Sequence, residues 1–155
     1  GELSFLGDFT GEISIEKVIG LKGSAVKLVQ RCAEILELED LNDGIAVFKV
    51  IESKENEQVQ TIFAEYCLMI ARMIVNLQVT LDLSKIVIGG GISAQNCLIQ
   101  NIREKYIFVR EQIPLLAVNF QEIKIEECKF RSDANLLGAV YNLLLVLDEK
   151  RNIQL

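Results

Sequence analysis

The stretch TLDLSKIVIGGGISAQ, residues 80–95, decides the fold of this chain. It contains an apolar run, Leu83–Ile88, that is rich in β-branched residues and typical of a fully buried strand in a parallel sheet. Three glycines, residues 89–91, follow at once and let the backbone turn sharply, because a residue without Cβ can adopt a positive φ. Ser93 then offers a side-chain oxygen to the free N–H groups of a helix. The stretch therefore predicts a strand, a glycine turn and a helix N-terminus in direct succession.

The predicted order of elements has a functional meaning. It gathers unpaired N–H groups and the positive end of a helix at the carboxyl edge of a sheet, where nucleotides and phosphates often bind. Gly89, Gly90 and Gly91 are therefore candidate nucleotide-binding residues. The stretch contains neither the GxGxxG fingerprint of dinucleotide-binding proteins nor the GxxxxGKS of a P-loop. A tight turn that any parallel α/β unit could use is the plainer alternative, and the motif alone leaves both open.

Length and composition narrow the class of protein. The chain has 155 residues, of which 50% are hydrophobic and 25% charged, so one domain with a substantial core is expected. A net charge of −6 repels phosphate backbones, so no nucleic-acid binding is expected through this segment. No apolar run reaches membrane-spanning length and no signal segment opens the chain. These features predict a cytoplasmic domain that has no membrane partner.

The cysteines do not form a metal-binding pattern. Cys32, Cys67, Cys97 and Cys128 are widely spaced, and the chain contains no histidine. A cysteine-rich zinc site needs two close pairs, which are absent. The pattern predicts four reduced, mostly buried thiols and no bound zinc.

Helical periodicity and capping residues predict the elements on either side of the glycine turn. Ser24 begins the first helix, and the single proline, Pro114, ends the one that follows the glycine turn. Leu115–Phe120 is expected to be an apolar connector. The predicted helices span residues 24–38, about 45–52, 59–77 and 93–113, and a second strand is predicted at residues 122–128.

The last predicted helix begins after Ser132, its expected N-cap, and runs over Ala134–Leu147. Gly138 lies inside this helix, where glycine costs about 1 kcal/mol relative to alanine, so a close backbone approach is expected there.

The sequence of helices and strands predicts an α/β unit with a right-handed crossover and a short parallel sheet. Two strands leave both sheet edges open, which is difficult to stabilise alone. We expect that the glycine-punctuated region 1–20 supplies further strands, or that further strands precede Gly1. A chain that opens directly at GELSF suggests an excised fragment.

Two segments resemble the ROK family (repressors, open reading frames and sugar kinases). The run Glu57–Gln95 is similar to the family's long helix, strand, GGG-[VI]-S turn and helix. The run EIKIEECKFRSDANLLGAVYNLL, residues 122–144, resembles its closing strand and last helix. The most specific part is Ile86–Ser93 together with Ser132–Leu144. The resemblance extends over nearly all of the chain.

Two boxes near the N-terminus also resemble the family. GELSF looks like its GE-x-G-H box, with Glu2 at the sugar-contacting glutamate, and with Ser4 and Phe5 in place of glycine and histidine. SIEKVIG is similar to the remnant of its cysteine-rich zinc box, with Glu16 at the terminal glutamate and Ser14 at a cysteine position. The resemblance makes Glu2 and Glu16 candidate sugar-binding residues, while solvated surface carboxylates are the plainer alternative.

The resemblance implies an actin-like, ribonuclease H-like ATPase fold of two lobes. In that fold residues 1–155 form a single domain, the later part of the C-terminal lobe. The family's DxGxT phosphate motif and catalytic aspartate lie upstream, so no catalytic residue is expected here, and ATP is expected only for a full-length protein.

The resemblance also implies two functions. The first is a sugar-sensing domain of a transcriptional regulator, similar to N-acetylglucosamine and xylose repressors. The alternative is the nucleotide-side half of an ATP-dependent sugar kinase.

Self-association is also expected. The apolar faces of the helices at residues 59–77 and 134–147 are wide for a two-stranded sheet, and unmatched apolar surface usually marks a partner site. The family commonly dimerises through its C-terminal lobe. A two-fold homodimer with those helices or an open sheet edge at the contact is therefore predicted.

Overall fold

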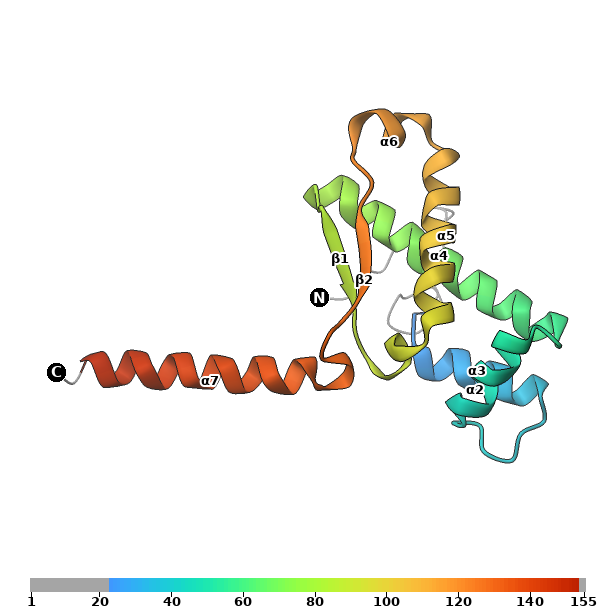
Figure 1. Cartoon of the computed structure of the whole chain (residues 1–155), viewed down its shortest axis with the longest axis horizontal. Coiled ribbons are helices and arrows are strands. Elements are labelled where there is room, and N and C mark those ends of the chain that lie inside the picture. Colours follow the sequence, from blue (N-terminus) through green and yellow to red (C-terminus); the bar gives the residue numbers. More distant parts are fainter. Residues whose placement is uncertain (1–22, 154–155) are drawn as a thin grey trace, which may run out of the picture.

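A computed structural model describes the backbone of residues 23–153, and the side chains within that range other than those of Ser132 and residues 149–153. The predictions for Glu2, Glu16 and the region 1–20 lie outside the described residues. The described elements are α2 (Ala25–Ile35), α3 (Gly44–Ser53), α4 (Glu57–Leu81), β1 (Lys85–Ile88), the 3-10 turn η2 (Gly91–Ala94), α5 (Asn96–Glu111), α6 (Pro114–Asn119), β2 (Lys124–Glu127), the 3-10 turn η3 (Arg131–Asp133) and α7 (Ala134–Ile153) (Figure 1).

Helix α4 is the centre of the fold. It begins where Asn56 Oδ1 accepts a hydrogen bond from the Val59 N–H at 3.0 Å, and it ends at Asp82, whose φ of 50° is left-handed. Its apolar stripe packs against α5 and α2, and α5 crosses it in Figure 1. The buried residues of α4 are Val59, Phe63, Cys67, Ala71, Ile74, Val75 and Gln78. The helical periodicity of residues 59–77 thus predicted the main core element.

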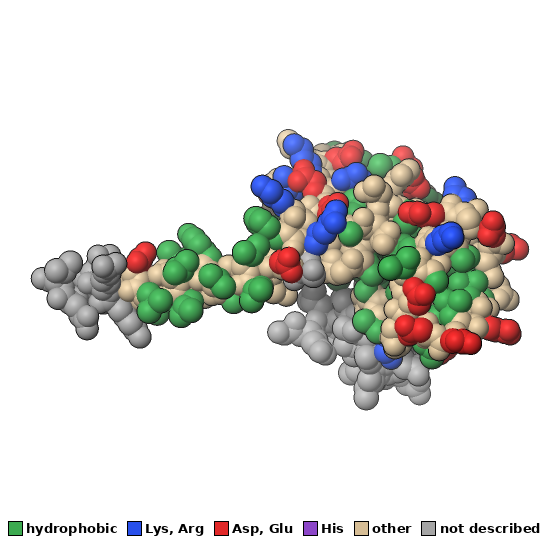
Figure 2. Space-filling view, turned by 60° about the horizontal axis from the view of Figure 1, so that its bottom comes forward, with side chains coloured by type: hydrophobic (Ala, Val, Ile, Leu, Met, Phe, Trp, Pro, Cys, Tyr) green, Lys and Arg blue, Asp and Glu red, His purple; other side chains and the backbone are tan. Residues whose placement is uncertain are grey.

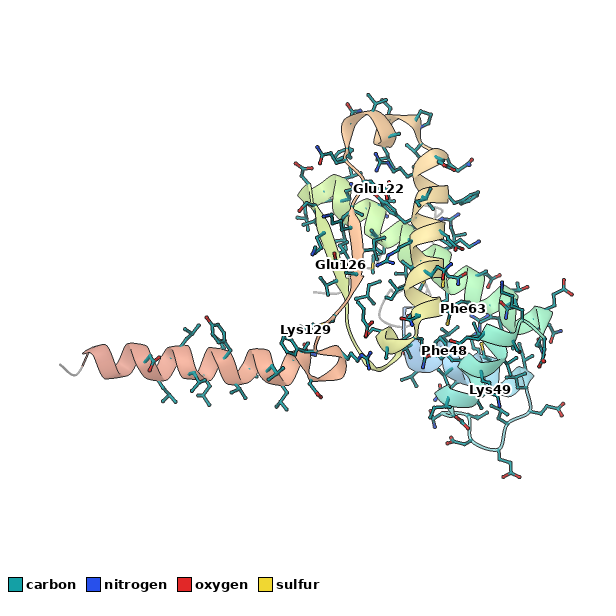
Figure 3. All side chains as sticks on the ribbon, viewed as in Figure 1. Phe48, Lys49, Phe63, Glu122, Glu126 and Lys129 are labelled. Carbon is teal, nitrogen blue, oxygen red and sulfur yellow. The ribbon has the colours of Figure 1, made fainter. Side chains whose placement is uncertain are left out.

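Helices α2 and α3 cover one end of α4. Ser24 Oγ accepts from the Lys27 N–H at 3.4 Å and begins α2, so the predicted cap is confirmed. Asp43 Oδ1 accepts from the Ala46 N–H at 2.9 Å and begins α3. Phe48 of α3 meets Phe63 of α4 edge to face, with ring centroids 6.1 Å apart and an interplanar angle of 85° (Figure 3). Such an aromatic pair stabilises the junction beyond its buried area.

Strands β1 and β2 form the predicted parallel pair, with Ile86 opposite Ile125. The prediction that the first strand is fully buried was wrong. Only one face of the sheet packs on the helices, because Lys85 and Val87 of β1 are exposed. On the open face Lys85 Nζ lies 2.9 Å from Glu126 Oε2, and this hydrogen bond lowers the pKa of the Glu126 carboxyl. The open face is therefore charged and offers little apolar area for a further helix.

The predicted connector at Leu115–Phe120 is instead the short helix α6. Pro114 occupies its first turn, where its fixed φ is compatible with a helix and no N–H is needed. Arg110 of α5 holds this segment, because its Nη2 donates to the Phe120 carbonyl at 2.6 Å and to the Ala117 carbonyl at 3.4 Å. The prediction failed because a helix of six residues has too few positions to show a helical period.

Helix α7 extends away from the rest of the molecule (Figure 1). It follows the turn η3, so Ser132 lies within that turn and not at the predicted N-cap position. The expected close approach at Gly138 was also wrong, since a Cβ there would meet nothing within 4 Å. Its large apolar side chains are 43–67% exposed, and Figure 2 shows hydrophobic side chains along both visible edges of the helix. They are Leu136, Leu137, Val140, Tyr141, Leu143, Leu144, Leu145, Val146 and Leu147.

The predicted partner surface is therefore confined to one of the two helices. The main apolar stripe of α4 is buried inside the chain and does not remain open for a second copy. Within the described residues, α7 keeps the unmatched apolar surface that the sequence assigned to both helices. A helix that is apolar on all sides is stable only when it is surrounded.

Among the described helices, α4 has the length and composition of a membrane span. It carries the charged residues Glu65 and Arg72 on its exposed side, and its other side supplies the buried core. These two properties are those of the core helix of a globular domain.

The two most deeply buried cysteines are expected to resist modification. Burial raises the pKa of the Cys67 thiol from 9.0 to about 12, and burial also raises the pKa of Cys32. Because the thiolate is the reactive form, iodoacetamide at pH 8 should label the half-buried Cys128 well before Cys67. Mass mapping of the folded protein measures this order, and labelling in urea is the control. Equal labelling rates for Cys67 and Cys128 in the folded protein would contradict the burial described here.

Candidate functional site

The glycine turn is built around one residue with positive φ. Gly90 has φ 100° and ψ 173°, a conformation that is essentially restricted to glycine. Its carbonyl accepts from the Ser93 N–H at 3.1 Å and from Ser93 Oγ at 2.7 Å. The predicted role of Ser93 as a helix cap was therefore wrong. Ser93 is fully buried and closes the turn on itself, while α5 begins three residues later at Asn96.

The turn lies against the loop that follows β2. The Cys128 N–H donates to the Ile88 carbonyl at 2.8 Å, and the Gly90 N–H donates to the Arg131 carbonyl at 3.5 Å. A Cβ on Gly89 would lie 3.6 Å from Cys128 Cβ. The carboxyl ends of the two parallel strands thus meet, as the sequence predicted. The Gly91 and Ile92 N–H groups donate to no residue within 23–153.

An apolar groove of about 360 Å³ lies beside the turn. Helices α2 and α3 form one wall and the turn η2 forms the other. Ile45 is 83% exposed and Val26 57% exposed, so two large apolar side chains border the groove without cover from the described chain. The lining residues are Ala25, Val26, Val29, Asn42, Gly44, Ile45, Phe48, Gly91, Ile92 and Gln95.

A second depression, of about 540 Å³, lies at the loop after β2. It is lined by Glu127, Lys129, Phe130, Arg131 and Asp133. Arg131, whose φ is 45°, places its Nε 2.7 Å from Glu127 Oε1, and Lys129 Nζ lies 5.8 Å from the centre of the Phe130 ring. Acidic and basic groups balance here, so this depression offers no concentrated charge for an anion or a cation. Within the part of the chain that the structure describes, no group of three metal-ligating side chains occurs.

The three predicted glycines occupy different positions relative to the groove. Gly91 lines the groove, Gly90 supplies the positive φ, and Gly89 packs against Cys128. Glu2 and Glu16 lie outside the described residues, so their sugar-binding role stays a prediction. Asn42 and Ile45 also line the groove and were not predicted, because the sequence of residues 42–44 indicates only a turn before a helix.

Gly90 is expected to tolerate substitution far less than its neighbour. Gly90→Ala forces a side chain into a positive φ and should lower the free energy of unfolding by about 2 kcal/mol. Gly91→Ala is the matched control, because a Cβ there meets nothing within 4 Å and its backbone is not in the positive-φ region. It should change stability by less than about 0.5 kcal/mol. Urea unfolding of both variants measures the difference, and equal losses would refute the backbone argument.

Comparisons with known proteins all find members of one protein family. The model of the ROK family matches residues 25–146. A ROK family protein from Streptococcus pneumoniae TIGR4, solved in complex with sucrose, is similar with a TM-score of 0.63 and 22% identity, over 79% of this chain and 40% of that one. A candidate sugar kinase from Cytophaga hutchinsonii ATCC 33406 is similar with a TM-score of 0.56 and 20% identity, over 76% and 40%.

These similarities show a shared fold, the actin-like ATPase fold that the sequence predicted. The chain spans 40% of the length of each of these two structures. No curated protein sequence matches the chain.

Proposed function

Because this chain belongs to the ROK family, we propose that it forms the nucleotide-binding side of a ROK sugar kinase that transfers phosphate from ATP to a sugar. The observation that carries the proposal is the apolar groove beside the glycine turn. The sequence placed a sugar-sensing regulator first and the kinase second, and membership of the ROK family supports both.

The apolar lining of the groove supports the binding of a nucleotide base. A base has two apolar faces, and Val26 and Ile45 would cover one of them while Gly91 and Ile92 support the other. The Gly91 and Ile92 N–H groups, which donate to no residue within 23–153, would suit phosphate or ribose oxygens next to the base. The sugar and the catalytic aspartate would bind and act outside the described residues, and the sucrose held by the pneumococcal protein makes a sugar the natural substrate class.

Methyl and amide NMR spectra of this chain during titration with ATP test the proposal. We expect shifts at Val26, Ile45 and Ile92, which line the groove. Ile45→Asp should weaken binding by roughly tenfold or more, because it introduces a carboxylate beside an anionic, apolar-faced ligand.

Val118→Asp is the matched control, since Val118 of α6 is 82% exposed, like Ile45 at 83%, and lies outside the groove. The nucleotide site would be refuted if ATP shifted no NMR signal of the groove residues. It would also be refuted if the ATP-induced shifts were the same in Ile45→Asp as in the unmodified chain.

The second candidate is the sugar-sensing regulator, similar to N-acetylglucosamine and xylose repressors. The absence of histidine supports it, because the family's sugar and zinc boxes use histidine and this chain has none. Calorimetry of the full-length protein with hexoses and N-acetylhexosamines, with and without ATP, separates the two candidates. Phosphorylated sugar supports the kinase, whereas sugar binding without turnover supports the regulator. If none of the sugars produced heat at millimolar concentration, both the kinase and the regulator proposals would be refuted.

We also propose that the protein is cytoplasmic and forms a two-fold homodimer with α7 or an open sheet edge at the contact. The four free thiols support the cytoplasmic location. The exposed apolar surface of α7 supports self-association of this chain. Sedimentation equilibrium at micromolar concentration tests the dimer, and a monomer at every concentration would refute it.

A further inference from the structure

Strand β2 has an outer edge, the edge that faces away from β1. The Lys124 N–H donates to the Ser84 carbonyl at 3.1 Å, so the backbone groups of Lys124 point toward the chain of β1. The backbone groups of successive residues alternate between the two edges of a strand. Those of Ile123, Ile125 and Glu127 therefore point to the outer edge. Such an edge is a template on which another strand can pair.

Side chains of α5 occupy this outer edge. Figure 1 shows α5 beside β2, on the side away from β1. Arg103 Nε donates to the Ile125 carbonyl at 2.7 Å. The Tyr106 hydroxyl accepts from the Ile123 N–H at 3.1 Å. Two backbone groups that a further strand would need are thus already bound by a helix.

The side chains that bind this segment form one row on α5. Arg103, Tyr106 and Arg110 are spaced by three and four residues, so they lie on one face of the helix. Arg110 Nη2 donates to the Phe120 carbonyl at 2.6 Å, on the chain that enters β2. The row therefore runs alongside residues 120–125, where a neighbouring strand would otherwise lie.

Arg103 has the properties that protect a sheet edge. Native proteins close such edges with charged side chains or with a covering helix, and α5 provides both. The guanidinium keeps its charge and its donors at every working pH. Because Arg103 is exposed, its charge also faces any strand that approaches. That strand would have to displace a charge-assisted hydrogen bond before it could pair.

We infer that Arg103, in line with Tyr106 and Arg110, closes the outer edge of β2 against pairing with another strand. This role goes beyond the proposed function and is independent of the nucleotide site. The partner that is kept out is an extended polypeptide, above all β2 of a second copy of this chain. A second copy that pairs with the sheet would therefore do so along β1.

Arg103→Met tests the inference, because it keeps the length of the side chain and removes the charge and the donors. Its self-association constant, measured by sedimentation equilibrium, should exceed that of the unmodified chain by roughly tenfold or more, since two copies can then pair along β2. Arg72→Met is the matched control. Arg72 is exposed on α4, and its replacement removes the same charge and adds the same apolar side chain. It should leave the association constant unchanged.

A proline shows whether the new contact lies on β2. The Glu127 N–H points to the outer edge, so Glu127→Pro removes a donor there and leaves the pairing with β1 intact. In the double variant Arg103→Met/Glu127→Pro the association constant should return to that of the unmodified chain. Association that persists in the double variant would lie on another surface and would overturn the inference.

The unmodified chain provides a test that does not depend on the folding of any variant. The Arg103 Nε–H should exchange with solvent roughly tenfold more slowly in the folded chain than in urea, because it is held on the Ile125 carbonyl. NMR of the arginine side chains measures both rates, and equal rates would overturn the inference. Equal association constants for Arg103→Met and the unmodified chain would also overturn it.

Discussion

Replacing Phe63 by alanine is expected to lower the free energy of unfolding by about 4 kcal/mol. Phe63 is 2% exposed in the second turn of α4, and its ring meets Phe48 edge to face, so truncation removes buried area, leaves a cavity and breaks an aromatic pair. Urea unfolding followed by circular dichroism measures the loss. Phe108→Ala is the matched control, because Phe108 of α5 is 51% exposed, and it should lower stability by less than about 1 kcal/mol. Similar losses for both variants would contradict the placement of the core.

The second large effect is expected from Tyr106→Phe, which removes a single oxygen. Tyr106 is 1% exposed, and its hydroxyl donates to Gln78 Oε1 at 2.8 Å and accepts from the Ile123 N–H at 3.1 Å. Gln78 Nε2 in turn donates to the Gln121 carbonyl at 2.6 Å, so the network joins α4, α5 and the segment entering β2. Removal leaves a buried acceptor and a buried donor without partners and should lower the unfolding free energy by about 3 kcal/mol.

Tyr66→Phe gives the comparison for that variant. Tyr66 is half-buried, and its hydroxyl donates to one carbonyl, that of Gly23, at 3.2 Å. Burial raises the pKa of Tyr66 to about 12, so the hydroxyl stays protonated over the usual working range. The same substitution there should lower the unfolding free energy by about 1 kcal/mol. If Tyr106→Phe lowers the unfolding free energy no more than Tyr66→Phe does, the buried network does not stabilise the junction between the helices and the sheet.

The elements that the sequence predicted correctly are those with strong local signals. The stripe of α4 repeats over seven turns, and Ser24 begins α2 as its residue type predicts. The glycines after Ile88 predicted the end of β1, and the parallel pairing follows from the helical crossover between two short strands. These features depend on neighbours in sequence, so they are visible without a structure.

The features that the sequence missed depend on residues distant along the chain. Ser93 has the residue type of a helix cap, but its hydroxyl donates to the Gly90 carbonyl instead. The groove forms only when Ile45 of α3 lies near Ile92 of η2, and no spacing rule connects those positions. Burial on one face of β1 likewise depends on which side α4 and α5 cover.

The register of the sheet determines the order in which the molecule can assemble. Lys85 pairs with Lys124, so the partners are 39 residues apart (124 minus 85), and α5 and α6 lie between them. Long-range pairing of this kind is slow, because the loop must close before any contact stabilises it, whereas α4 and α5 are neighbours in sequence and can pack early. The Ile88–Cys128 and Gly90–Arg131 hydrogen bonds that shape the glycine turn form only after the strands have paired. The wall of the groove at Gly91 is therefore expected to form late in folding. A ligand bound there would stabilise the paired strands against local unfolding.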